Sequence, residues 1–163
     1  MPKLSAGVLL FRRTPAAEVL LVHPGGPFWK NKDAGAWSIP KGEYESGEDA
    51  LAAAFREFEE ETGFRLDAGA AVIPLGNVKQ AGGKIVTAWA LEQDLDAARI
   101  RSNTFDLEWP PKSGKLQQFP EIDRAEWFGF SAARERLLKG QLAFLTRLAE
   151  ALQLADVVDA GGN

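Results

Sequence analysis

The chain has no cysteine and only one histidine among its 163 residues. The absence of cysteine excludes a disulfide framework, which is consistent with a protein of the cytoplasm. The apolar run over residues 4–11 is far shorter than the roughly 20 residues that a membrane-spanning helix requires. Its positive neighbours, Arg12 and Arg13, follow the run rather than precede it, which is not the arrangement of a signal peptide. We therefore expect a cytoplasmic protein without a membrane partner.

Charge and length set further limits. The net charge of -4 and the pI near 5.1 argue against a polymeric nucleic-acid partner, although they leave room for a local basic pocket. With 45% hydrophobic residues and no long linker, the sequence predicts a single domain over residues 1–155. Residues 156–163 are expected to form a frayed C-terminal tail. No feature of the sequence indicates the oligomeric state.

The apolar runs alternate between strand and helix patterns, which predicts an α/β protein with a mixed β-sheet between helices. Strands are expected over residues 4–11, 18–22, 36–39, 70–78, 84–92 and 125–130. The pair Gly82-Gly83 is a good turn for a hairpin between the fourth and fifth of these strands. Amphipathic helices are expected over residues 47–62 and from 131 to about 154. Residues 24–35 and 103–121 are expected to be loops.

Three carboxylates share one face of the helix predicted over residues 47–62. Glu57, Glu60 and Glu61 stand at i, i+3 and i+4, which places them within about 100° of one another on the helical wheel. A solvated acidic face is the simpler interpretation. However, like charges four residues apart repel, and acidic groups near a helix C-terminus oppose the helix dipole. Both penalties favour a bound cation, and oxygen ligands without cysteine indicate Mg²⁺ or Mn²⁺ rather than Zn²⁺.

The ends of this helix also have sequence signals. Ser46, followed three residues later by Asp49, predicts the N-terminus, and Gly63 stands where a left-handed C-terminal cap is expected.

At this helix the chain resembles the Nudix hydrolases. Their signature is a Gly, five residues, Glu, seven residues, Arg-Glu, an apolar residue, any residue, Glu-Glu, any residue, Gly and an apolar residue. The matching residues are Gly42, Glu48, Arg56, Glu57, Phe58, Glu60, Glu61, Gly63 and Phe64. Every specified position is filled without a gap, which is too specific a match to arise by chance.

The resemblance implies an α/β/α sandwich and the hydrolysis of a diphosphate linkage by attack of water on phosphorus, with Mg²⁺ or Mn²⁺ as the cofactor. The implied metal ligands are Glu57, Glu60, Glu61 and the carbonyl of Gly42. Arg56 would orient a ligand carboxylate through a bidentate pair. Glu48 would support the loop or the metal site near the helix start.

The predicted loop over residues 103–121 is a candidate for substrate contacts, because long loops are more often functional than idle. Lys112 and Lys115 could bind phosphates, while Trp109 and Phe105 could stack on a base. In the alternative interpretation, Trp109 and the loop prolines only hold the loop against the core.

In several Nudix enzymes a further carboxylate comes from a loop shortly before the last strand of the sheet. Glu121 stands in a comparable place, six residues before Trp127. The resemblance thus makes Glu121 the candidate for an extra metal ligand or a general base. Asp123 is the second choice.

The segment before the signature reads Trp37-Ser38-Ile39-Pro40-Lys41-Gly42. Lys41 precedes the expected diphosphate site, so its charge could bind phosphate, although it could also be a solvated loop residue. Nudix enzymes that act on dinucleoside polyphosphates or diphosphoinositol polyphosphates often have Trp-x-x-Pro-Lys-Gly at this place, whereas MutT-type enzymes more often have Pro-Gly-Gly. Either Trp37 or Trp29 could cover a base, although a core position suits them equally. The only histidine, His23, follows an apolar strand and is expected to be structural.

The resemblance therefore favours a metal-dependent hydrolase of a small nucleotide, preferably a dinucleoside polyphosphate. A MutT-like pyrophosphohydrolase of nucleoside triphosphates or their deoxy forms is one alternative. A Nudix-fold nucleotide sensor without turnover is an alternative of a different class.

Overall fold

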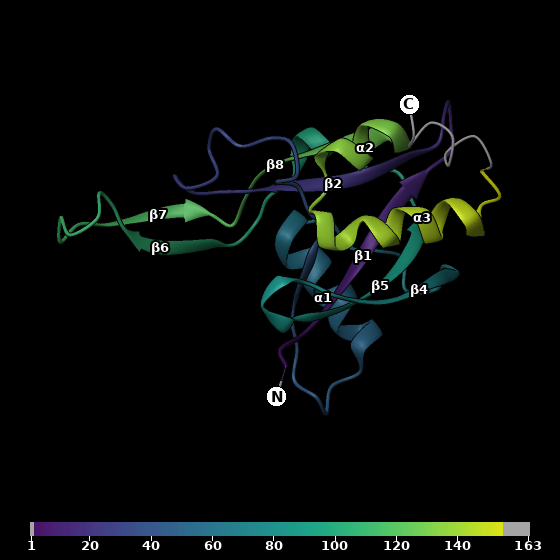
Figure 1. Cartoon of the computed structure of the whole chain (residues 1–163), viewed down its shortest axis with the longest axis horizontal. Coiled ribbons are helices and arrows are strands. Elements are labelled where there is room, and N and C mark those ends of the chain that lie inside the picture. The colour runs from purple at the N-terminus through teal and green to yellow at the C-terminus, as the bar shows by residue number, and fades with distance from the viewer. Residues whose placement is uncertain (1, 155–163) are drawn as a thin grey trace.

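A buried strand, β1 (Leu4–Arg12), runs through the middle of the computed structural model, which describes residues 2–154 (Figure 1). Its seven inner residues are all buried, because both faces of the strand are covered. The sheet has six strands in the order β4-β5-β1-β2-β8, and β3 pairs with β1 beside this path. The flanking strands are β4 (Val72–Lys79), β5 (Ile85–Glu92), β2 (Glu18–Pro24), β8 (Ile122–Gly129) and β3 (Lys41–Glu43).

The sheet is mixed, as the sequence predicts. β1 pairs in parallel with β5 from Leu4↔Ile85 to Phe11↔Glu92, and every other pairing in this sheet is antiparallel. The expected hairpin between β4 and β5 is confirmed, since Gly82 and Gly83 both adopt a φ of 87° in the turn.

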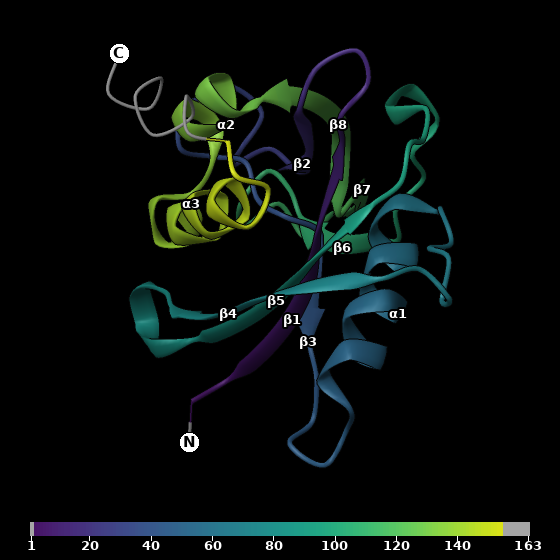
Figure 2. The ribbon, with the colours of Figure 1, turned by 90° about the vertical axis from the view of Figure 1, so that its right-hand side faces the viewer.

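Helices cover both faces of the sheet (Figure 2). Helix α1 (Ala50–Thr62) packs on one face, over a core that contains Val8, Leu10 and Phe58. Helices α2 (Phe130–Arg136) and α3 (Leu142–Ala151) pack on the other face, over a second core. The predicted α/β/α sandwich is therefore confirmed.

Helix α1 begins later than the sequence predicts. Its N-cap is Asp49 rather than Ser46, because the Asp49 carboxylate accepts a hydrogen bond of 2.9 Å from the backbone N–H of Ala52. The helix therefore starts at Ala50 and not near residue 47. Its C-terminal end is as expected, since Gly63 has a φ of 78° and its N–H donates to the carbonyl of Glu59 at 2.7 Å.

The helix expected from residue 131 to about 154 is in fact two helices. Leu137 is extended (φ -72°, ψ 144°), and a short 3₁₀ turn over Lys139–Gln141 precedes α3. The chain is held there by the segment before β3, because the N–H of Leu138 donates to the carbonyl of Trp37 at 2.8 Å. That segment, residues 36–39, forms single bridges to Val22 and Leu137 instead of the expected strand.

The prediction of a long loop over residues 103–121 is wrong. This region forms a hairpin of β6 (Thr104–Glu108) and β7 (Leu116–Pro120), which is a separate two-stranded sheet that projects from the body (Figure 1). Its turn is tied by the Glu108 carboxylate, which accepts hydrogen bonds from the N–H groups of Lys112 and Gly114. The expected frayed tail over residues 156–163 lies outside the described residues. Within residues 2–154, no helix is both long and apolar enough to cross a membrane.

The cap of α1 gives a testable prediction. Replacing Asp49 by alanine should lower the free energy of unfolding by about 1 kcal/mol, because the N–H of Ala52 loses its acceptor. Urea unfolding followed by circular dichroism measures this difference. Ser46→Ala is the matched control and should leave stability unchanged. A larger loss from Ser46→Ala than from Asp49→Ala would contradict the assigned cap.

Candidate active site

A cavity of about 220 Å³ lies beside the C-terminal half of α1. The end of β2 and the starts of β3 and β8 also border it. Its lining residues are Val22, Pro24, Trp29, Ser38, Lys41, Glu61, Glu121, Ile122 and Leu138. The structure thus brings together three residues that the sequence singles out, namely Lys41, Glu61 and Glu121. Trp29 joins them from the loop that follows β2.

The Glu61 carboxylate is held against the start of β3. Its Oε1 atom accepts a hydrogen bond of 3.1 Å from the backbone N–H of Lys41. The pKa of Glu61 is raised to about 8, chiefly by burial and also by the nearby carboxylates of Glu121 and Glu57, while Lys41 acts in the opposite direction. At neutral pH this group therefore holds a proton unless a cation stabilises its charged form.

Glu57 lies directly against the backbone of Gly42. A Cβ atom at position 42 would collide with the Glu57 carboxylate, so the signature glycine is required for this close approach. Burial raises the pKa of Glu57, and the neighbouring charge of Glu60 contributes, while the hydrogen bond from Arg56 lowers it. The contact places the Gly42 backbone beside a predicted ligand, as the signature implies.

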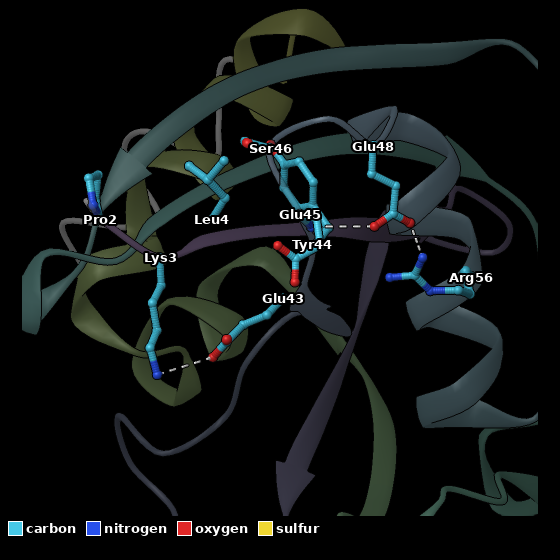
Figure 3. Close-up of a pocket in the computed structure, with 9 residues that line it drawn as sticks. All are labelled: Pro2, Lys3, Leu4, Glu43, Tyr44, Glu45, Ser46, Glu48 and Arg56. Atoms are coloured by element: carbon cyan, nitrogen blue, oxygen red, sulfur yellow. Dashed lines mark hydrogen bonds and ion pairs between the residues drawn. The ribbon is translucent and has the colours of Figure 1, made fainter.

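Arg56 connects the helix to the loop before it. Its guanidinium pairs with the carboxylate of Glu48 (Figure 3). It also pairs with Oε2 of Glu57 at 3.1 Å. The arginine thereby fixes one oxygen of Glu57 and leaves the other for Gly42 and for a ligand. This arrangement agrees with the positioning role that the resemblance implies for Arg56.

The carboxylate oxygens of this site are the type of ligand that a hard divalent cation prefers. Glu57 interacts with Glu60, and Glu61 interacts with both Glu57 and Glu121, so like charges crowd one region. All the available donors are oxygens, which suits Mg²⁺ or Mn²⁺. Across residues 2–154, however, no three carboxylate or imidazole side chains converge as a metal-binding group. The residues are therefore neighbours, but they do not form a closed ligand set.

One predicted contact, Trp37, lies outside the cavity. Trp37 is only 1% exposed, its Nε1–H donates to Asp33 at 2.8 Å, and its ring packs on His23 and Phe128. It has no free face for a base, so its predicted substrate role is corrected to a core role. Trp29, by contrast, lines the cavity.

His23 has a structural position, since its two ring nitrogens lie 2.8 Å from Oδ1 of Asp123 and 2.6 Å from the carbonyl of Lys32. The Asp123 carboxylate is thus occupied. This leaves Glu121 as the candidate base, and its backbone is held by hydrogen bonds with Gly25 and Asn103.

The hairpin residues do not reach the cavity. Trp109 packs edge-to-face on Phe28 with ring centroids 5.4 Å apart, so it holds the hairpin against the loop after β2. Lys112 and Lys115 are exposed in the hairpin turn, and Phe105 lies over Gly26. None of these four side chains lines the cavity, and the substrate roles of Trp109, Lys112 and Lys115 stay predictions.

One important residue had no sequence signal. Gln141 is fully buried, and its Oε1 accepts a hydrogen bond of 3.0 Å from the backbone N–H of Ile39. Its amide nitrogen donates to Ser38 Oγ at 3.1 Å and to Gln80 at 3.0 Å. Gln141 therefore fixes the segment that leads into Lys41. A glutamine within an expected amphipathic helix gives no hint of this role, because its partners are 61 to 103 residues away in the chain.

Comparison with known proteins decides the family. A model of the NUDIX domain matches residues 1–148. The chain belongs to the Nudix family. Members of this family generally use divalent metal ions, which agrees with the oxygen-rich helix face of this Nudix chain.

Solved structures share the Nudix fold with this chain. The binary complex of a C. elegans Ap4A hydrolase is 20% identical, with a TM-score of 0.63 over 92% of this chain and 98% of that one. The NUDIX domain of Shewanella oneidensis NrtR complexed with ADP ribose is 16% identical, with a TM-score of 0.63 over 93% and 89% of the two chains. RenU, a Nudix hydrolase from M. smegmatis, is 24% identical, with a TM-score of 0.55 over 93% and 86%. At these identities the likeness concerns the fold.

One curated relative is closer in sequence but much longer. An octanoyltransferase from Myxococcus xanthus is 33% identical over 125 residues, which are 77% of this chain and 30% of that protein. The Nudix chain thus spans less than a third of the length of this relative.

The raised pKa of Glu61 predicts how stability depends on pH. Because the folded protein binds this proton more tightly than the unfolded chain, the metal-free protein should lose stability as pH rises from about 5 to 9. The loss should reach a few kcal/mol at most, since one pKa unit corresponds to about 1.4 kcal/mol. Glu61→Gln should flatten this dependence. Urea unfolding across this pH range, with a chelator present, measures both profiles.

Glu59→Gln is the matched control for this experiment. Glu59 lies on the same helix but is exposed and pairs with Arg65 at 3.5 Å, so its loss should leave the slope unchanged. Equal slopes for the wild type and Glu61→Gln would show that Glu61 does not cause the dependence.

Proposed function

We propose that this Nudix chain is a divalent-metal-dependent hydrolase of a diphosphate linkage in a nucleoside polyphosphate, with a preference for dinucleoside polyphosphates. The observation that carries the proposal is the cavity beside α1. It places the cation of Lys41, the carboxylates of Glu61 and Glu121 and the ring of Trp29 around one space. These groups are suited to a phosphate, a metal-bound water and a base.

Glu57, Glu60, Glu61 and the carbonyl of Gly42 would hold the Mg²⁺ or Mn²⁺ ion. When bound, this ion neutralises phosphate charge and lowers the pKa of a coordinated water. Arg56 keeps Glu57 in place through its bond to Oε2. The backbone N–H of Lys41 does the same for Glu61.

The remaining residues act directly on the substrate and the water. Lys41 donates to a phosphate oxygen at the mouth of the cavity, where burial and the nearby charge of Lys84 lower its pKa. Glu121 accepts the proton of the attacking water, because its carboxylate forms no ion pair within residues 2–154 and it lines the same cavity as Lys41. Breaking the bond between phosphorus and the bridging oxygen then releases the two phosphate products.

Trp29 is suited to stack on the nucleobase. It is half-buried at the cavity wall, and Lys32 lies 5.1 Å from its ring centroid on the loop that carries both residues. A base is an appropriate partner because every base has a π-face, and stacking on an aromatic ring contributes about 1–3 kcal/mol. The proposed substrate is thus a small nucleotide and not a nucleic-acid polymer or a membrane. A cytoplasmic location accords with the absence of cysteine.

Substrate preference can be measured with a panel of diadenosine polyphosphates, deoxynucleoside triphosphates and ADP-ribose, each with Mg²⁺ and with Mn²⁺. We expect the highest kcat/KM for diadenosine polyphosphates, because Lys41 adds a phosphate contact next to the Nudix signature. A preference for one deoxynucleoside triphosphate would indicate a MutT-like enzyme instead. Binding without turnover would indicate a sensor.

The carboxylates provide a separate prediction. Glu60→Gln or Glu61→Gln should lower kcat by about 100-fold or more at saturating Mg²⁺ while the fold is retained, since each removes a charged ligand. Steady-state kinetics and circular dichroism measure the two effects. Glu59→Gln changes the same helix by one charge but lies outside the cavity, so it should retain normal turnover. Normal activity in Glu61→Gln would remove Glu61 from the proposed ligands.

Trp29→Ala should raise KM about tenfold for nucleotide substrates and leave kcat nearly unchanged, because it removes stacking energy without touching the reacting groups. Trp29→Phe keeps a ring and should restore most of the affinity. Unfolding curves of both variants show whether the loop remains folded. An unchanged KM in a folded Trp29→Ala variant would contradict the stacking role.

A further inference from the structure

A second cavity, of about 580 Å³, lies between the start of β1 and the loop that joins β3 to α1 (Figure 3). Its volume is typical of small-molecule sites, which measure roughly 300–1,000 Å³. The first cavity, with Trp29 in its wall, has only about 220 Å³. A substrate with two nucleosides therefore needs more space than the first cavity offers.

The two cavities lie on either side of the proposed metal ligands. On β3, Lys41 lines the first cavity and Glu43 lines the second. Gly42 separates these two residues, and its backbone lies against the Glu57 carboxylate. On α1, Glu61 lines the first cavity one helical turn after Glu57. A substrate chain that crosses Glu57 therefore has an open space at each end.

Tyr44 forms an aromatic wall of the second cavity. It stands two residues after Gly42, so the alternation of an extended chain directs both positions toward α1. The side chain packs against the edge of the core under this helix and is half-buried, which leaves part of the ring open to a ligand. Figure 3 shows the ring between Leu4 and the ion pair of Arg56 with Glu48.

The loop that follows Tyr44 is held in place by the protein itself. The N–H of Glu45 donates to the Glu48 carboxylate at 3.4 Å, and the N–H of Glu48 donates to the carbonyl of Glu45 at 2.9 Å. Glu48 also pairs with Arg56, which ties the loop to α1. A wall that is already ordered costs a ligand less free energy to bind.

The charges around the second cavity favour a neutral group over a phosphate. Its charged lining consists of the carboxylates of Glu43, Glu45 and Glu48 and the cations of Lys3 and Arg56. Both cations already have partners, since Arg56 pairs with Glu48 and Lys3 lies 4.0 Å from Glu43. The carboxylates repel a phosphate, but they accept hydrogen bonds from hydroxyl and amino groups. A nucleoside offers such groups together with a flat ring for Tyr44, and it has no charge.

We infer that the second cavity binds the second nucleoside of a dinucleoside polyphosphate, with its base stacked on Tyr44. This inference rests on the proposed function, because the phosphates between the two nucleosides would lie at the proposed metal ligands. Trp29 and Tyr44 then hold one base each. Tyr44 is thus a specificity-determining residue for substrates with two nucleosides, whereas a nucleoside triphosphate has only one base and gains nothing from it.

Tyr44 can be observed directly, because it is the only tyrosine of the chain and labelled tyrosine gives the signals of one ring. The probes are methylene-bridged analogues of diadenosine tetraphosphate and of ATP, which resist hydrolysis. Each is titrated into the full chain at excess Mg²⁺ and followed by NMR. The diadenosine analogue should shift the ring signals upfield, because a stacked base shields the ring, and the ATP analogue should leave them nearly in place. Equal shifts with both analogues, or no shift at saturation with the diadenosine analogue, would overturn the inference.

Substitution of Tyr44 tests the contribution of the ring to affinity. Tyr44→Leu should weaken binding of the diadenosine analogue about tenfold, and binding of the ATP analogue by less than about twofold, because only the former loses a stacked base. Tyr44→Phe keeps the ring and should retain the affinity. Calorimetry measures binding, and circular dichroism checks the fold. Failure of the wild type to bind the diadenosine analogue more tightly than the ATP analogue would contradict the second site.

Phe28→Leu is the matched control. It makes a similar change at an aromatic residue that is 60% exposed and lines neither cavity. Both affinities should remain unchanged. A loss equal to that of Tyr44→Leu would show that the effect is not specific to the second cavity and would also overturn the inference.

Turnover separates this inference from the proposed function. Tyr44→Leu should raise KM for diadenosine tetraphosphate about tenfold and leave kcat nearly unchanged, because the ring does not touch the reacting groups. Selective binding of the diadenosine analogue that depends on Tyr44, without turnover of any nucleotide, would support the site and reject the hydrolase. A normal KM for diadenosine tetraphosphate in an active Tyr44→Leu variant would support the hydrolase and reject the site.

Discussion

The close packing of β3 against α1 is the constraint on which the site depends. Gly42 has no side chain, so its backbone can lie against the Glu57 carboxylate, and the N–H of Lys41 can reach Glu61. A larger residue at position 42 would push the strand away from the helix and separate both contacts. This one approach orients two carboxylates on the helix and, at the same time, fixes the lysine next to them. The acidic and the basic parts of the site are therefore set by the same three strand residues.

The opposite side of this segment is held by the C-terminal part of the chain. Gln141 accepts a hydrogen bond from the N–H of Ile39, and the carbonyl of Trp37 accepts one from the N–H of Leu138. Both bonds are buried or nearly so, where an unpaired polar group costs about 1–3 kcal/mol. The break between α2 and α3 makes the second bond possible, because a continuous helix would use the N–H of Leu138 internally. The irregular chain at this point thus serves to position the entry to the cavity.

The sequence predicted those parts of the structure that depend on local spacing. The face shared by Glu57, Glu60 and Glu61 follows from helical periodicity alone, and the β4–β5 hairpin follows from a Gly-Gly turn. Long-range contacts decide the rest. No residue of the β6–β7 hairpin is buried, and prolines and a glycine lie between its strands, so the sequence favours a loop there although β6 alternates between exposed and half-buried residues. Trp37 was assigned to substrate because its burial depends on β2 and α2, which no local pattern reveals.

Charges of both signs meet where β3 packs against α1, since Lys41 and Glu61 line the same cavity. Alternation along the strand directs Gly42 toward α1 and directs Lys41 and Glu43 toward the α3 side. Burial raises the pKa values of Glu57 and Glu61, and repulsion between neighbouring carboxylates adds to the effect, while burial and the charge of Lys84 lower the pKa of Lys41. Each group of like charges is thus destabilised when alone. In the proposed function, a divalent cation offsets the charge of the carboxylates, and the phosphates of the substrate offset the charge of Lys41. The metal and the substrate should therefore each strengthen the binding of the other.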